Sequence, residues 1–160
     1  MNTPRPSAPQ RQHGVAAIEF ALILPVTVLL LAFILFFGRL FWHYNVALKA
    51  AGDMATFVAL ARSVEITEQK PDFSEIGIVR LARTIGDAEL AELSPGNGGR
   101  PMIDISCDGF PCRGAQIPEE IGVLVQMSMY DIFFPELTSQ IGNTDGMLLR
   151  AEVRVRYAGS

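Results

Sequence analysis

The sequence GVAAIEFALILPVTVLLLAFILFFG, at residues 14–38, sets the architecture expected of this chain. Its last 19 residues, Phe20 to Gly38, contain no charged side chain. As an α-helix they would extend roughly 28 Å, close to the hydrocarbon thickness of a bilayer. A cation and three aromatic side chains follow, a composition typical of the headgroup layer: Arg39, Phe41, Trp42 and Tyr44. We therefore expect a membrane-spanning helix at about residues 20–38.

The composition of the whole chain limits the classes of function. The 160 residues are 49% hydrophobic and only 19% charged, enough for one small domain beside the apolar helix. A net charge of −4 argues against a nucleic-acid partner. Both histidines, His13 and His43, precede the segment expected to form the domain, which leaves that domain without a histidine for catalysis or metal binding. We expect no enzymatic activity, no metal and no cofactor.

We expect the apolar helix to remain attached to the domain. It is longer than the apolar region of a secretory signal, and the small-residue pattern at 50–52 lies well beyond it. Positive charge is nearly balanced across the span, with Arg5 and Arg11 before it and Arg39 and Lys49 after it. A short leader without acidic residues still favours a cytoplasmic amino end.

Glu19 stands at the start of the apolar run. A carboxylate in hydrocarbon costs on the order of a few kcal/mol unless it has a partner. One interpretation places Glu19 near the headgroups, stabilised by the helix dipole. The other depends on cleavage after Gly14, which would create an ammonium on Val15 one helical turn from Glu19. The two charges could then neutralise each other within a chain or between neighbouring chains.

Gly14, the Glu19–Phe20 pair and the long apolar helix resemble the processing site of type IV prepilins. More narrowly, GVAAIEFALILP with the downstream pair Gly38–Arg39 resembles the TadE-like family of the tight-adherence (Flp) type IVb pilus system. The resemblance implies that a prepilin peptidase cuts after Gly14 on the cytoplasmic face. Val15 would become the new amino terminus, with Glu19 as the fifth residue of the mature chain.

The same resemblance implies a pseudopilin or minor pilin in the bacterial inner membrane. Its domain would lie in the periplasm, and the subunit could be incorporated into a surface pilus that serves adhesion. The implied partners are the prepilin peptidase, other pilins and pseudopilins, the pilus assembly platform and the membrane.

A single long helix is expected from about residue 16 to residue 65. Pro25 removes one backbone hydrogen bond in mid-span and should kink the helix, either harmlessly or as a shape for packing against other subunits. Beyond the span, apolar residues recur at helical spacing and predict a face that packs on the domain, with partner binding as the less favoured interpretation: Val46, Ala50, Met54, Phe57, Ala61 and Val64.

The remaining sequence predicts one more helix and a small sheet. Ser74 caps a helix that runs to about Leu93, and residues 94–101 form a loop. Alternating patterns predict strands at 102–106, 122–130 and 149–157, with a helical turn at 135–141 and a turn at 143–146. The side of the helix expected to pack carries Ile78, Leu81, Ala82 and Ile85.

These elements together predict an α+β fold. A long N-terminal transmembrane helix continues into an amphipathic helix that packs on a small antiparallel sheet, the layout of pilin-like proteins. The expected boundaries are a cytoplasmic leader at 1–14, the long helix at 15–66 and a periplasmic α+β domain at 67–160.

Cys107 and Cys112 are expected to form a disulfide in an oxidising periplasm, because Asp108 to Pro111 suit a tight loop. Zinc would need two further ligands that the domain does not offer. The acidic side chains near the loop are expected to be solvated charges without a catalytic partner: Asp104, Asp108, Glu119 and Glu120.

Two questions stay open at this point. The arginines of the last strand, Arg150, Arg154 and Arg156, form either an ordinary charged outer face or a docking stripe for an acidic partner. The chain could also be an uncleaved single-pass anchor for a periplasmic binding or scaffold module, which would give Glu19 no role. The least favoured interpretation is a secreted soluble domain that is released by signal cleavage near Gly52.

Overall fold

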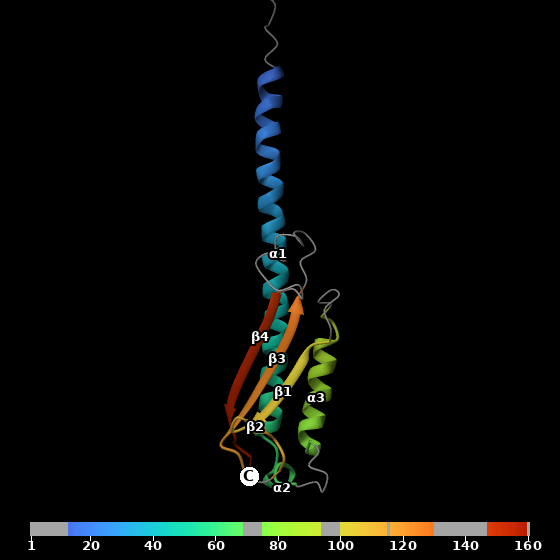
Figure 1. Ribbon diagram of the computed structural model, residues 1–160, viewed down its shortest axis with the longest axis vertical. Helices are drawn as coiled ribbons and strands as arrows, with labels where there is room; N and C mark the ends of the chain where they lie inside the picture. Colours follow the sequence, from blue (N-terminus) through green and yellow to red (C-terminus); the bar gives the residue numbers. More distant parts are fainter. Residues whose placement is uncertain (1–12, 69–74, 94–99, 115, 130–146, 160) are drawn as a thin grey trace, which may run out of the picture. The chain divides into compact units, whose positions relative to one another are not determined.

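The computed structural model describes residues 13–68, 75–93, 100–114, 116–129 and 147–159. The chain divides into two compact units, Met1–Phe37 and Gly38–Ser160. Helix α1 (His13–Ala59) contributes to both units, and the other described elements belong to the second (Figure 1). These elements are α2 (Ser63–Ile66), α3 (Gly77–Leu90), β1 (Met102–Cys107), β2 (Phe110–Pro111), β3 (Glu120–Met129) and β4 (Met147–Arg156).

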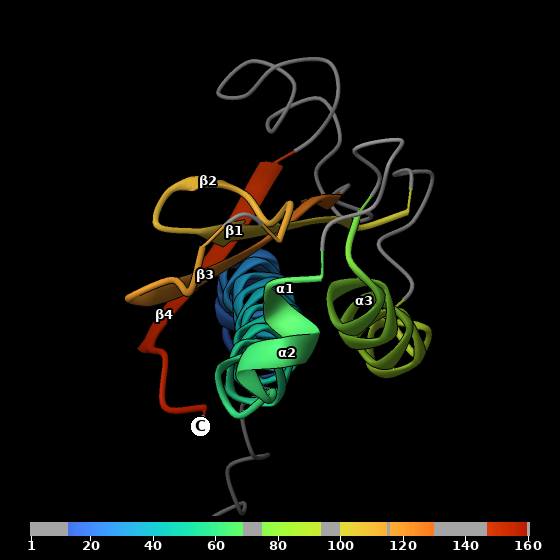
Figure 2. The same ribbon diagram turned by 90° about the horizontal axis from the view of Figure 1, so that it is seen from below.

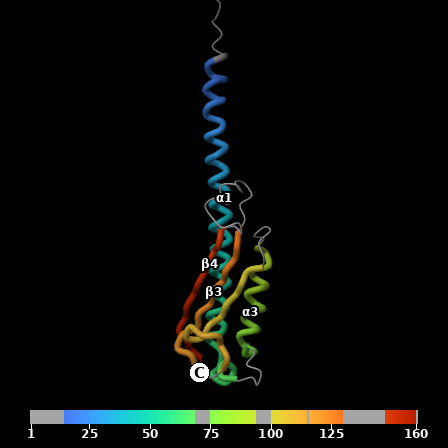
Figure 3. The backbone as a smooth tube through the Cα atoms, viewed as in Figure 1, coloured from blue at the N-terminus to red at the C-terminus, as the bar shows by residue number. Residues whose placement is uncertain are grey.

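The described strands form one antiparallel sheet in the order β2-β1-β3-β4. β3 is the central long strand, and its side chains alternate between buried and half-buried positions along its length. Val123 pairs with Ile105 of β1 and with Val153 of β4, so apolar side chains of three strands line up on the inner face. Figure 3 follows the backbone through this arrangement.

The core of the second unit lies between the inner face of this sheet and the helices α1 and α3, which Figure 2 shows side by side on that face. The buried part of α1 is rich in small side chains, which allows the helix to approach the sheet closely. Its buried residues in the core are Ala47, Ala50, Ala51, Met54, Ala55, Val58 and Ala59.

The packed side of α3 is rotated from the expected one, although Ala82 is buried and Ile78 packs against the core as expected. Leu81 is 52% exposed, whereas Val79, Ala82, Gly86 and Leu90 are buried. Gly86 explains the rotation, because a Cβ atom built there would clash with the Sδ atom of Met54 in α1. α3 therefore meets α1 at its smallest residue, while the sequence pattern favoured the larger apolar side chains.

The expected single helix to residue 65 is wrong at its end. α1 stops at Ala59, and Arg62 adopts an extended backbone before the short α2. The Arg62 backbone N–H donates to Glu65 Oε2 at 3.2 Å, which caps this new turn. Val64, expected on the packed face, is consequently 77% exposed.

The strands agree with the sequence to within a few residues, and the α+β class is confirmed. The two-residue strand β2 was not predicted, because its pairing depends on the tight turn that precedes it. Ser74, Tyr130, most of the 94–101 loop and the expected turns at 135–141 and 143–146 lie outside the described residues.

Candidate functional site

The residues expected at the processing site lie in the first turns of α1. Gly14 is the second residue of the helix and Val15 the third. The first backbone N–H groups of a helix have no partner within it, so this turn can open at low cost. Val15 and Glu19 are four positions apart and lie on the same side of α1, separated by a rise of about 6 Å.

The Glu19 carboxylate is exposed and makes no hydrogen bond or ion pair with any described residue. The next cation along α1 is Arg39, on the far side of the apolar run. Phe20, beside Glu19, is 65% exposed. The part of the chain that the structure describes therefore supplies no compensating charge for Glu19.

From Val15 to Phe37, α1 exposes its large apolar side chains, from Val15 at 72% to Phe33 at 37%, except for the half-buried Phe36. Nothing in its most apolar window is buried inside the molecule, so this segment is not the core helix of a soluble domain. α1 continues through Pro25, and the Thr27 hydroxyl donates to the Ile23 carbonyl oxygen at 3.0 Å. By length and composition the helix can cross a membrane.

The aromatic residues after the span point away from the core of the second unit. Phe41 is 62% exposed and Trp42 is 50% exposed. His43, between Trp42 and Tyr44, is buried and its Nδ1–H donates to the Arg39 carbonyl oxygen at 2.8 Å, so the expectation that no histidine lies in the folded unit is wrong. The reason is that the second unit begins at Gly38, and so includes part of the long helix.

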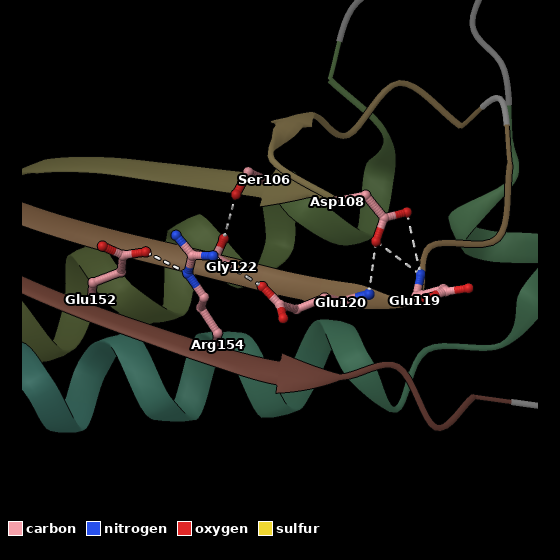
Figure 4. Close-up of polar contacts among 7 residues, drawn as sticks. All are labelled: Ser106, Asp108, Glu119, Glu120, Gly122, Glu152 and Arg154. Atoms are coloured by element: carbon pink, nitrogen blue, oxygen red, sulfur yellow. Dashed lines mark hydrogen bonds and ion pairs between the residues drawn. The ribbon is translucent and has the colours of Figure 1, made fainter.

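Cys107 and Cys112 form the expected disulfide. Asp108 and Gly109 adopt φ angles of 52° and 80°, which produce a two-residue hairpin turn of the type that an Asp-Gly pair favours. The Asp108 carboxylate accepts the backbone N–H groups of Glu119 at 3.0 Å and Glu120 at 2.8 Å (Figure 4). Asp108 is therefore a structural clamp as well as an exposed charge; the Asp-Gly pair signals the turn but not the clamp.

Arg83 of α3 is a structural residue that the sequence did not reveal. Its guanidinium donates to the Ile103 carbonyl oxygen of β1 and makes two hydrogen bonds to the Glu75 carboxylate. The hydrogen bond to Glu75 raises the pKa of Arg83 above its already high ordinary value. These contacts hold α3 against β1 and place Arg83 beside a cavity of about 240 Å³ that Asp104 and Arg113 also line.

The arginines on the outer face of β4 differ in their contacts. Arg154 Nε donates to Glu152 at 2.6 Å, and its Nη1 atom lies 3.4 Å from Glu120 of β3 (Figure 4). Arg150 and Arg156 are exposed and make no ion pair with a described residue. Within the described ranges, no cluster of three or more metal-ligating side chains exists.

The apolar helix and the second unit define a class, namely an α+β protein with one N-terminal helix for single-pass membrane anchoring. Over residues 14–55, about a quarter of the chain, the sequence matches the family model described as TadE-like protein, which confirms the resemblance and connects the chain with the Tad pilus and its components. That family is structural and non-enzymatic in kind. A search among curated proteins finds no match, and neither does a search among solved structures.

Proposed function

We propose that this chain is a pseudopilin or minor pilin that is needed for assembly of a tight-adherence pilus. A prepilin peptidase removes residues 1–14 on the cytoplasmic face of the inner membrane, and the second unit lies in the periplasm. The observation that carries the proposal is the family match over residues 14–55, which begins at Gly14.

Charge at the start of α1 supports the same proposal. Glu19 has no partner among the described residues, although it is followed by a long apolar segment. Cleavage after Gly14 supplies the missing cation as the ammonium of Val15, on the same side of the helix. Within one chain or between neighbouring chains, this pair lowers the cost of holding a carboxylate at the edge of hydrocarbon.

The disulfide supports the periplasmic orientation. Cys107 and Cys112 are bonded in the structure, and such bonds persist in an oxidising compartment but are rare in the cytosol. A cytoplasmic leader and a periplasmic disulfide require the chain to cross the membrane once, which α1 is long enough to do.

Intact mass spectrometry tests the processing step. The full chain is coexpressed with its prepilin peptidase, and the expected product begins at Val15. Gly14→Leu should block the cut. Gly38→Leu is the matched control. Gly38 lies in α1 like Gly14, and no atom lies within 4 Å of a Cβ atom added at Gly38. An unchanged full-length mass for the wild-type chain would contradict the proposed processing.

Glu19→Gln tests the charge separately from processing. The substitution keeps the size and hydrogen-bonding capacity of the side chain but removes its charge. If Val15 and Glu19 pair in assembly, the cleaved E19Q chain should fail to support pilus formation, which is measured by shearing surface pili from cells and quantifying them. Normal piliation by this variant would instead favour an uncleaved or passive anchor that carries a binding or scaffold module.

A further inference from the structure

One end of the sheet exposes apolar side chains. Leu148 and Met147, at the start of β4, are 47% and 39% exposed, and Met102, at the start of β1, is 66% exposed. The strand register places Met102, Gln126 and Arg150 in one row across the outer face, with Leu148 beside Ser128 two residues further along. On the outer face, Leu148 and Met102 therefore combine uncovered apolar surface with the cation of Arg150, and Met147, opposite Met129, adds apolar surface on the inner side of the same end.

The opposite end of the same face has a different character. There, Glu120 and Glu152 pair with Arg154, and the two carboxylates offset Arg154 and Arg156 in net charge, although Arg156, like Arg150, makes no ion pair with a described residue. Arg150 makes no such ion pair with a described residue. Apolar exposure and an uncompensated positive charge thus coincide at the Leu148 end, a combination typical of surfaces that contact lipid headgroups.

A contact at the other end of β4 allows us to estimate which part of α1 lies level with Leu148. The Tyr157 hydroxyl donates to the Ala61 carbonyl oxygen at 2.8 Å, and β4 and α1 share the core between them. From Tyr157 back to Leu148 the chain extends about 30 Å, a length that an α-helix covers in about 20 residues. By this estimate Leu148 lies roughly level with Phe41 and Trp42. Figure 1 shows β4 running along α1 toward the end of that helix.

We propose that this end of the sheet, Met147, Leu148 and Arg150 with Met102 beside them, contacts the surface of an anionic bilayer. The exposed aromatic side chains Phe41 and Trp42 mark the headgroup layer on α1, and Leu148 is at their level. Leu148 and Met147 contact the upper acyl chains and glycerol region, and Arg150 binds lipid phosphate. The second unit is then held against the membrane at two places, the helix and the sheet.

Intrinsic fluorescence of the full chain in vesicles tests this proposal, because Trp42 is the only tryptophan. In a Trp42→Phe background, a new tryptophan is introduced by Leu148→Trp, or by Arg156→Trp as the matched control on the same face of β4. Phosphatidylglycerol-containing vesicles carry lipids brominated near the top of the acyl chains. The L148W chain should show blue-shifted emission and loss of intensity with brominated lipid, whereas the R156W chain should show neither.

The contribution of charge is measured with the L148W chain in the same vesicles. Neutralising one arginine near an anionic surface should lower the ratio of docked to undocked molecules about five-fold. Arg150→Gln should therefore reduce the quenching, whereas Arg156→Gln should not. In purely zwitterionic vesicles, the L148W chain that keeps Arg150 should show the same reduced quenching as the R150Q variant.

Three outcomes would overturn the proposal. Equal behaviour of the L148W and R156W chains means that the sheet end is not at the lipid surface. Blue-shifted emission that lipid bromine does not quench, and that grows with protein-to-lipid ratio, assigns this surface to a second copy of the chain. Quenching that is the same in anionic and zwitterionic vesicles removes the role of Arg150. Flotation with the vesicles confirms membrane insertion first, and the proposal depends on that insertion alone, so failure of cleavage after Gly14 leaves it intact.

Discussion

The hydroxyl group of Tyr157 donates a hydrogen bond to the carbonyl oxygen of Ala61 at 2.8 Å, between residues 96 positions apart in the sequence. One residue further, the Ala158 backbone N–H donates to the Ala59 carbonyl oxygen at 3.0 Å. The last carbonyl groups of a helix have no partner within it. The end of the chain therefore completes the hydrogen bonding at the end of α1 and ties the last strand to the long helix.

Tyr157→Phe should destabilise the second unit by about 1 kcal/mol, because the Ala61 carbonyl loses its donor while the ring still packs. Urea unfolding of the full chain in detergent, followed by circular dichroism, measures the change. Tyr44→Phe is the control, since Tyr44 is exposed and makes no hydrogen bond with a described residue. This substitution should leave the urea midpoint unchanged. Equal midpoints for Y157F and the wild type would show that the hydroxyl contributes nothing to stability.

Gly86→Ala should also destabilise the protein, although alanine is the better helix former by about 1 kcal/mol. An added Cβ would clash with Met54 Sδ, and Met54 is completely buried, so its side chain has little room to move. Overpacking of this kind costs about 1–3 kcal/mol, which exceeds the gain in propensity.

Gly52→Ala is the matched control, because Gly52 lies in α1 with no atom within 4 Å of an added Cβ, and this change should stabilise the protein. Unfolding midpoints of the two variants should therefore move in opposite directions from the wild type. A double variant, Gly86→Ala with Met54→Ala, should show a favourable coupling energy if the steric contact is the cause.

The sequence predicted the strands better than the helix faces, for a physical reason. In β4 the alternation of Val153 and Val155 with arginines leaves one possible inner face, and the structure has that face. In α3 the packed side was decided by where α1 could approach most closely, and Gly86 carries no hydrophobic signal. The hydrophobic periodicity of one helix or strand carries no information about the surface shape of the element that it packs against.

The candidate site divides in the same way. The Cys107–Cys112 bond and the exposed apolar span follow from local sequence, and the structure contains both. The roles of Arg83 and Asp108 depend on backbone groups of Ile103 and Glu119, which are distant in the sequence and offer no side-chain pattern. Hydrogen bonds to the backbone are therefore the part that sequence reasoning missed.

Acid should weaken the ion pair between Lys49 and Asp53 on α1. Lys49 donates to Asp53 at 2.9 Å and to Glu89 of α3 at 3.1 Å, and the hydrogen bond from Lys49 lowers the pKa of Asp53 below its ordinary value of about 3.8. The unfolded chain consequently takes up the proton at higher pH than the folded one. The stability from this group is present above pH 3.8 and is lost as the pH falls below that value.

The effect should be small, because Lys49 and Asp53 are largely exposed and solvent screens their attraction. Asp53→Asn should lower stability at pH 6 and reduce the further loss between pH 4 and pH 2, as followed by urea midpoints. Glu92→Gln, at an exposed position without a described contact, serves as the control. If the urea midpoints of D53N and the wild type fell equally steeply between pH 4 and pH 2, the contact between Lys49 and Asp53 would contribute nothing to the free energy of unfolding.

The hairpin at the disulfide should depend on two separate constraints, the bond and the Asp108 clamp. Opening a ring of this size by Cys107→Ser with Cys112→Ser should cost about 2 kcal/mol on the loop-entropy argument. Asp108→Ala should cost about 1–3 kcal/mol, because it leaves the N–H groups of Glu119 and Glu120 without their acceptor and places alanine at a positive φ.

Asp108→Asn separates those two causes, since asparagine tolerates the positive φ and keeps an acceptor oxygen. It should recover most of the stability lost in D108A, as measured by urea unfolding under oxidising conditions. Asp104→Ala is the control on β1, with an exposed carboxylate that makes no described hydrogen bond. If D108N were as unstable as D108A, the negative charge would be the decisive property, because the geometry of the turn would then be preserved while the charge-assisted bonds were lost.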